Sequence, residues 1–346
     1  MRRSRTPLAA VLVLALAAIA ALGGTALGST GRHAPRAHAA SKRLVGIGDE
    51  NPLMFSSPEW QALHVSIARY FTAWNVATGD DPTDLFYLRS WLAAAQAAGV
   101  QPLVSFYHND TTPEQMPSVA AYTQAMQDFV AMFPTVKILS PWNEVNRGNV
   151  REPGDSYDSP TPKEAAEYYL ALKRVCPTCT IVGLDVLDST TPSATIAYIN
   201  AFKHDVGKKH MPHIWGLHNY SETNRFEDNG TKAMLRDVPG QLWLTETGGL
   251  AKLKPSFPFN LKRQARATKY MFALADSSSR IKRLYIYSWF PGGSSEFDAG
   301  LVNAAGEPRA SFCAVYEHIR GKKHCPYKTV KNRPRHGRSH RGHAHR

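Results

Sequence analysis

Short apolar runs alternate with longer amphipathic stretches between residues 44 and 320 of the chain. Each run is five or six residues long and mostly made of Val, Ile, Leu or aromatic residues, as in strands that are buried on both faces of a parallel sheet. The pattern therefore predicts strands at Leu44–Gly48, Tyr70–Trp74, Pro102–Tyr107, Val136–Ser140, Thr180–Leu184, Ile214–His218, Gln241–Thr245 and Leu284–Trp289.

The stretches between these runs have the spacing of amphipathic helices. Asp81 and Ser118 stand where helices are expected to begin, and Gly99 and Gly207 where they are expected to end. The predicted helices are Thr83–Ala98, Ser118–Phe133, Pro162–Val175, Pro192–Val206, Leu261–Ala275 and Arg309–Arg320, with only a short polar helix after Tyr220. Eight strands, each followed by a helix or loop, predict an α/β fold, a single (β/α)8 TIM barrel.

The amino-terminal segment has the pattern of a secretory signal peptide. Basic residues precede an apolar run of 15 residues, Leu8 to Leu22, and Ala37-His38-Ala39 follows as a cleavage site. A membrane anchor is the alternative, but this run is short against the ~20 residues that span a bilayer. We therefore expect a secreted, extracellular protein with a signal peptide at 1–39, a basic linker at 40–43 and a catalytic domain at 44–327.

Net charge is concentrated at the two ends of the chain. Residues 1–43 and 328–346 each carry seven Lys or Arg and no acid, so the residues between them contribute −1 to the net charge of +13. A nearly neutral folded part argues against nucleic-acid binding. The tail at 328–346 is basic, rich in His and expected to be disordered. It would either contact an anionic cell-wall polymer or simply aid solubility, and we expect no specific metal there.

Four cysteines in an exported chain indicate disulfides. Cys176 and Cys179 are neighbours in sequence, and Cys313 pairs most simply with Cys325. The Cys-x-x-Cys spacing also occurs in redox motifs, but those stand at a helix start after a strand. Here the motif follows a predicted helix, which favours a structural bridge.

Two glutamates close predicted strands and are the strongest candidates for chemistry. Glu144 follows the fourth strand in Trp142-Asn143-Glu144, and Glu246 follows the seventh in Leu244-Thr245-Glu246. The carboxyl ends of the strands are where (β/α)8 barrels carry their active sites. Two carboxyl groups at that edge could flank one glycosidic bond.

At these motifs the chain resembles the clan A glycoside hydrolases, retaining (β/α)8 enzymes that include families 5 and 39. The resemblance covers about residues 44–320 and rests on Asn143-Glu144, Glu246 and His218-Asn219-Tyr220, with Arg69 one residue before the predicted strand two and Trp289 ending strand eight. It implies that Glu144 is the acid/base and Glu246 the nucleophile. The chain departs from the pattern at Val145, where relatives often have proline.

The resemblance also implies roles for the neighbouring residues. Asn143 is expected to hydrogen-bond the sugar 2-hydroxyl, and Trp289 to form the floor of the −1 subsite. Arg69 and Tyr220 are expected to keep Glu246 ionised. Apolar walls and the second carboxylate should raise the pKa of Glu144, so that it starts protonated.

Other polar and aromatic residues are weaker candidates. His218, His108 and Trp74 are expected to contact substrate. Trp142 is equally compatible with the core. The acidic residues that follow strands one and five either bind sugar hydroxyls or cap loops; they are Asp49, Glu50 and Asp185.

The sequence thus predicts a monomeric retaining glycoside hydrolase that acts on β-linked polysaccharide or oligosaccharide by double displacement. A transglycosylase of the same fold and a non-catalytic polysaccharide-binding barrel at the cell wall are the alternatives. A metal-dependent hydrolase is disfavoured, because no His-x-His or His-Glu-x-x-His motif ends a strand. We therefore expect no metal and no other cofactor.

Overall fold

A parallel sheet of nine strands, in the order β5-β4-β3-β2-β1-β10-β8-β7-β6, organises the fold. The computed structural model describes residues 43–79, 81–109, 111–150, 159–292 and 294–331. The expected signal peptide and the histidines of the tail lie outside these residues. The strands of the sheet are β1 (Leu44–Gly48), β2 (Ile67–Ala73), β3 (Gln101–Tyr107), β4 (Ile138–Ser140), β5 (Thr180–Ile181), β6 (Asp185–Leu187), β7 (Ile214–His218), β8 (Gln241–Thr247) and β10 (Ile281–Tyr287).

β5 and β6 stand at the two ends of the strand order, but they follow each other directly in the chain and together form one strand position of a barrel, here called a stave. The sheet therefore closes into a barrel. Between them the backbone crosses from one neighbour to the other. The Val182 amide donates to the Leu139 carbonyl of β4, and the Gly183 amide donates to the Ile214 carbonyl of β7. With β5 and β6 taken together the barrel has eight staves, and the predicted (β/α)8 fold is confirmed.

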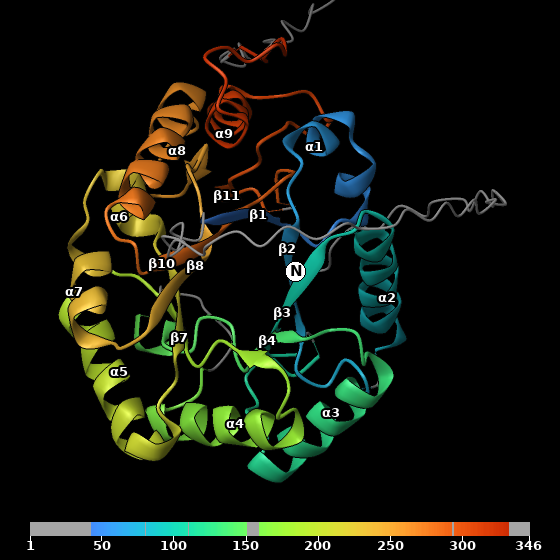
Figure 1. Ribbon diagram of the computed structural model, residues 1–346, viewed down its shortest axis with the longest axis vertical. Coiled ribbons are helices and arrows are strands. Elements are labelled where there is room, and N and C mark those ends of the chain that lie inside the picture. The colour runs from blue at the N-terminus through green and yellow to red at the C-terminus, as the bar shows by residue number, and fades with distance from the viewer. Residues whose placement is uncertain (1–42, 80, 110, 151–158, 293, 332–346) are drawn as a thin grey trace, which may run out of the picture. The chain divides into compact units, whose positions relative to one another are not determined.

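Helices follow the staves and surround them in Figure 1. They are α1 (Pro58–Leu63), α2 (Pro82–Ala97), α3 (Val119–Met132), α4 (Pro162–Val175), α5 (Pro192–Val206), α6 (Tyr220–Arg225), α7 (Asn229–Asp237), α8 (Leu261–Asp276) and α9 (Ala310–Arg320). Three 3₁₀ turns lie at Pro52–Ser56, Arg147–Val150 and Lys208–His210, and a small antiparallel pair joins β9 (Lys252–Leu253) to β11 (Phe297–Asp298).

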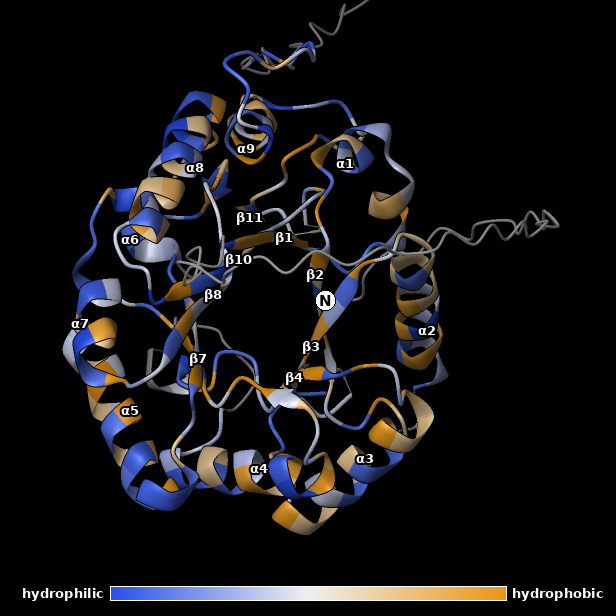
Figure 2. Ribbon diagram, viewed as in Figure 1, coloured by the Kyte–Doolittle hydropathy of each residue, from blue (hydrophilic) through white to orange (hydrophobic). Residues whose placement is uncertain are grey.

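Local signals explain where the main helices begin. Asp81 accepts a hydrogen bond from the Thr83 amide ahead of α2, and Ser118 does the same for Ala121 in α3. Thr161 and Glu164 form a reciprocal capping box at α4. Figure 2 shows hydrophilic and hydrophobic residues mixed along the outer helices, as expected for helices with one face on the core.

The barrel interior is filled in layers. At the amino-terminal end a closed apolar cluster fills it, made of Ile67, Leu103, Ile138, Val182, Trp243 and Tyr285 with Ile214 packed against them. One step further along the staves the interior becomes polar, with Arg69, Ser105 and Asp185 all buried. The functional side chains therefore stand on a packed floor and not over a pore.

Two strand boundaries differ from the prediction in ways that affect the site. β2 begins at Ile67, so Arg69 lies within the strand and points into the barrel. β10 ends at Tyr287, so Trp289 lies beyond it. The unit after β7 has two short helices, α6 and α7.

Both predicted disulfides are present, Cys176–Cys179 and Cys313–Cys325. Cys176 caps the end of α4, which agrees with a structural bridge. Across the described ranges, no helix combines the length and the apolar character that crossing a bilayer requires.

Candidate active site

Glu246 lies on β8 at the carboxyl end of the barrel, and both of its oxygens accept hydrogen bonds. Arg69 on β2 donates to Oε2 over 2.7 Å, and the Tyr220 hydroxyl donates to Oε1 over 2.9 Å. The carboxylate is 10% exposed and Arg69 is 1% exposed, so this charge pair is held largely away from water. A cation and a hydroxyl donor at this distance stabilise the ionised form of a carboxyl group.

Glu144 stands next to Glu246 and reaches the site through an unusual turn. Its φ angle is 50°, in the left-handed region that residues other than glycine seldom adopt. His218 Nδ1 lies 3.0 Å from Glu144 Oε1 and 3.6 Å from Glu246 Oε2. One oxygen of each glutamate and this nitrogen all lie within 4.8 Å of one another. The two carboxyl groups therefore face the same small volume.

Asp185 supports this group from below. Its carboxylate is fully buried, lies 3.2 Å from His218 Nε2 and accepts hydrogen bonds from Thr245 and Arg69. A side chain at Gly216 of β7 would clash with Asp185, so glycine is needed there. Asp185 was a candidate for sugar contact, but its burial shows that it orients His218 and Arg69 instead.

The electrostatics of Glu144 differ from the expectation. Burial alone would raise its pKa, but the hydrogen bond from His218 and the charge of Arg147 bring the pKa down to about 2. Arg147 NH1 lies 3.0 Å from Glu144 Oε2. The predicted raised pKa is therefore wrong for the substrate-free protein, because the sequence does not show that two cations reach this carboxyl group.

The proton that Glu144 lacks is held by His218. Burial would lower the pKa of His218, but the charges of Asp185 and Glu246 and hydrogen bonds to Asp185 and Glu144 raise it to about 10. Asp185 is ionised beside it: burial would raise its pKa, and His218 and Arg69 lower it to about 2. His218 is thus a buried imidazolium between three carboxylates.

This imidazolium makes stability depend on pH. The pKa of His218 is raised to about 10 in the folded protein against ~6.5 in an unfolded chain. Its contribution to the free energy of unfolding is therefore complete below about pH 6.5 and is lost as pH rises towards 10. We expect the wild type to lose about 1 kcal/mol per pH unit more than His218→Asn between pH 7 and 9.

Urea unfolding at pH 7, 8 and 9 measures this difference. His204→Asn is the matched control, because the His204 side chain is 88% exposed, and it should follow the wild-type slope. Equal slopes for the wild type and His218→Asn would contradict a buried imidazolium.

Tyr287, and not Trp289, brings an aromatic ring to this edge of the barrel. Trp289 is fully buried and packs edge-on against Phe312 of α9, with ring centroids 5.8 Å apart. The prediction that Trp289 forms a sugar platform is therefore wrong. β10 ends two residues earlier, and the half-buried ring of Tyr287 lies between those of Phe71 and Phe297, 6.3 and 6.2 Å away. The sequence does not show that the strand ends at Tyr287, because the apolar run continues to residue 289.

Of the remaining candidates, one lies beside the glutamate pair and two pack in the core, while the role of His108 is not tested. Asn143 is buried beside the pair and accepts a hydrogen bond from Arg69. Trp142 is fully buried and stacks on Tyr168, and Trp74 packs against the main core. His108 follows β3, and its Nδ1 lies 3.0 Å from the carbonyl oxygen of Asn109. This contact does not test whether His108 meets substrate, so that role stays a prediction.

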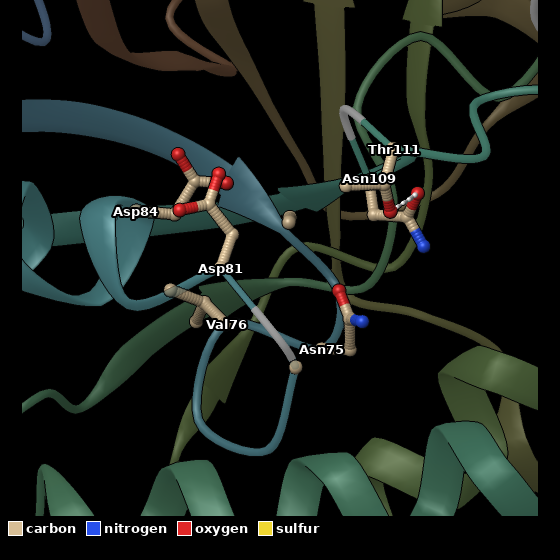
Figure 3. Close-up of a pocket in the computed structure, with 8 residues that line it drawn as sticks. Asn75, Val76, Asp81, Asp84, Asn109 and Thr111 are labelled. Atoms are coloured by element: carbon tan, nitrogen blue, oxygen red, sulfur yellow. Dashed lines mark hydrogen bonds between the residues drawn. The ribbon is translucent and has the colours of Figure 1, made fainter.

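A hollow opens beyond β2 and β3 among residues that follow these strands. Figure 3 shows Asp81 and Asp84 on one side of it and Asn75, Asn109 and Thr111 on the other. Its lining contains neither glutamate of the pair.

In the part of the chain that the structure describes, one group of side chains has donor atoms close enough to hold a metal: Glu144, His218 and Glu246. The same two carboxylates already receive the guanidinium groups of Arg69 and Arg147. Two cations at these oxygens favour acid–base and nucleophilic chemistry over metal binding.

Comparison with known proteins supports the fold. The sequence matches no family model and no curated protein. Among solved structures, a GH5_18 protein from Streptomyces cattleya in complex with GlcNAc aligns with 82% of this chain and 80% of its own at 14% identity and a TM-score of 0.59. Xylanase 10B from Thermotoga petrophila RKU-1, in complex with xylobiose, aligns with 85% of this chain and 99% of its own at 15% identity and a TM-score of 0.58.

A family 39 glycoside hydrolase from Bacteroides cellulosilyticus WH2 has a TM-score of 0.53 at 15% identity. That match covers 80% of this chain, which spans about 64% of the length of the other. The fold is therefore the clan A-like barrel of families 5, 10 and 39, and at such identities the likeness concerns the fold alone.

Proposed function

We propose that this protein is a secreted retaining glycoside hydrolase that cleaves β-linked sugars by double displacement. The observation that carries the proposal is the spacing of the two glutamates, since one carboxylate oxygen of Glu144 lies within 4.8 Å of one of Glu246. Retaining enzymes hold their two carboxyl groups about 5–5.5 Å apart, whereas inverting enzymes need about 6.5–9.5 Å to admit a water.

In the first step Glu246 attacks the anomeric carbon and forms a glycosyl ester as the bond to the leaving oxygen breaks. Arg69 and Tyr220 orient its two oxygens for this attack. Glu144 delivers a proton to the leaving oxygen. Because His218 Nδ1 is 3.0 Å from Glu144 Oε1, His218 is the source that supplies Glu144 with this proton.

In the second step Glu144, now ionised again, removes a proton from water and returns it to His218 Nδ1, which restores the imidazolium. The water attacks the anomeric carbon and releases Glu246. Asp185, whose Oδ1 lies 3.2 Å from His218 Nε2, keeps the imidazole ring oriented in both steps. The low exposure of both glutamates strengthens these charge interactions.

The structural neighbours agree with this proposal, since they include proteins described as glycoside hydrolases and xylanases, with bound xylobiose in one case. We extend to this chain an oligosaccharide or polysaccharide substrate. Export through the amino-terminal segment is part of the proposal, and so is contact of the basic tail with an anionic cell-wall polymer.

The test is sugar release from β-glucans, mannan, xylan, galactan and arabinan by residues 41–346, followed by proton NMR of the anomeric configuration at early times. We expect one polymer to be cleaved with a β-configured first product. An α-configured first product would contradict double displacement, and polymer binding without any release would favour the non-catalytic barrel.

Two controls separate the remaining alternatives. We expect activity to be unchanged after treatment with a chelator, because no step uses a metal ion; loss of activity that a divalent ion restores would contradict this. Products longer than the starting oligosaccharide would identify a transglycosylase.

A further inference from the structure

A third carboxyl group, that of Glu50, stands beside the glutamate pair at the end of β1. β1 lies between β2 and β10 in the barrel, and its last residue, Gly48, is paired with Arg69 on one side and Tyr287 on the other. Glu50 follows two residues later and is half-buried. Its position thus puts it next to the strand that orients Glu246 and the strand that ends in the aromatic ring.

The backbone beneath Glu50 is tied down by Asp49. One Asp49 oxygen accepts from the Asn51 amide and the other from the Phe290 amide, both over 2.8 Å. The Asp49 carboxyl is therefore a loop cap, one of its two predicted roles. This cap joins the end of β1 to the segment after β10, so that Glu50 is held at a fixed place on the rim.

The Glu50 carboxyl itself has spare hydrogen-bonding capacity. Among the residues that the structure describes, it makes one hydrogen bond, which its Oε2 accepts from the Tyr287 hydroxyl over 3.2 Å. A half-buried carboxyl group with one oxygen oriented in this way leaves the second oxygen for a ligand.

Its place around the barrel identifies the part of the substrate that it would meet. β1 is three places from β4, whose end carries Glu144, and two places from β8, which carries Glu246. The leaving group must lie at the acid/base Glu144. The sugar that is transferred to Glu246 therefore extends towards the other side, where Glu50 and Tyr287 stand.

The negative charges around Glu50 disfavour a sugar that carries its own negative charge. Burial and the charges of Asp49 and Glu246 raise the pKa of Glu50 well above its usual range, and Arg69 and Tyr287 offset this only in part. These four ionisable residues act on Glu50 from β2, β8, β10 and the segment that follows β1. The raised pKa favours the protonated form of Glu50, in which the second oxygen can donate a hydrogen bond.

We propose that Glu50 is a specificity-determining residue that donates a hydrogen bond to an oxygen of a neutral glycone, with Tyr287 orienting its carboxyl group. A glycone with its own carboxylate would bring a further negative charge towards Asp49 and Glu246 and is disfavoured. The proposal rests on the glycoside hydrolase function proposed above. It adds a residue and a substrate class to that function: a neutral sugar and not a uronic acid.

Two variants test the role of Glu50 on the neutral substrate that the wild type cleaves fastest, either a polysaccharide or a 4-nitrophenyl β-glycoside of glucose, xylose, mannose or galactose. Glu50→Gln keeps an acceptor for Tyr287 and a donor for the sugar, so kcat/KM should stay within about threefold of the wild type. Glu50→Ala loses both, so KM should rise about tenfold with little change in kcat. Glu227→Gln, at an exposed site, is the control.

The pH profile and one charged substrate complete the design. As pH rises, the wild type should lose kcat/KM relative to Glu50→Gln, because only a glutamate can lose its proton. The control ratio for Glu227→Gln should stay flat. We expect 4-nitrophenyl β-glucuronide to be cleaved at least about tenfold more slowly than the best neutral glycoside.

The outcomes separate this inference from the proposed function. If the wild type is active but Glu50→Ala keeps the wild-type KM, or Glu50→Gln is as impaired as Glu50→Ala, the role of Glu50 is wrong and the hydrolase function stands. A wild type that prefers the glucuronide also overturns the inference alone. If the wild type cleaves neither the polymers nor the aryl glycosides, both proposals fail together.

Discussion

Glu246→Gln is expected to lower kcat on the best substrate on the order of 10⁴-fold or more, the size of loss seen when a covalent nucleophile is removed. An amide oxygen cannot form the glycosyl ester, so the first step has no intermediate. The amide oxygen can still accept from Arg69, and the amide nitrogen can donate to the Tyr220 hydroxyl, in place of the contacts that now hold Glu246 at 2.7 and 2.9 Å. The fold should therefore survive the change.

Steady-state kinetics with urea unfolding alongside would measure this effect. A 2-deoxy-2-fluoro glycoside of the substrate sugar offers a second readout, since it should add one glycosyl mass to the wild type and none to Glu246→Gln. Glu227→Gln, on the exposed surface, should behave as the wild type. Full activity of Glu246→Gln, or labelling at a different carboxyl group, would show that Glu246 is not the nucleophile.

Glu144→Ala is expected to lose about 10³-fold in kcat/KM on substrates with poor leaving groups, within the usual range for general acid–base catalysis. Substrates whose leaving group needs no proton, such as 2,4-dinitrophenyl glycosides, should react in the first step at close to the wild-type rate. Their second step should be slow, because no base activates the water. Added azide should then speed turnover and give a β-glycosyl azide.

This dependence on the leaving group separates Glu144 from a residue that only holds the structure together. A structural defect would slow good and poor leaving groups alike and would not respond to azide. An α-glycosyl azide would mean that the nucleophile and the acid/base have been exchanged. Equal losses on both kinds of substrate would remove Glu144 from the acid/base role.

The identity of the barrel and the position of its reactive edge follow from local patterns. Apolar runs such as Pro102–Tyr107 can only be buried on both faces, and the helix starts at Asp81 and Ser118 depend on residues next to them. Once strands are counted in order, Glu144 and Glu246 must share the carboxyl edge. Both disulfides also follow from short separations along the chain.

Strand ends and side-chain direction are harder to predict, because they depend on packing across the barrel. The apolar run from Leu284 to Trp289 does not show that the strand stops at Tyr287, where the chain turns under α9 and buries Trp289 on Phe312. A difference of two residues changes which aromatic ring lies at the carboxyl edge of the barrel.

The protonation of the site depends entirely on the tertiary structure. The sequence alone determined the fold class and the two glutamates, since both depend on period and order along the chain. Only the folded barrel brings His218, oriented by Asp185, beside Glu144, where it joins the sequence neighbour Arg147 in lowering the pKa of Glu144. Charge interactions depend on distance and burial, and Glu144, Asp185 and His218 belong to separate strands or strand ends that meet only when the sheet closes.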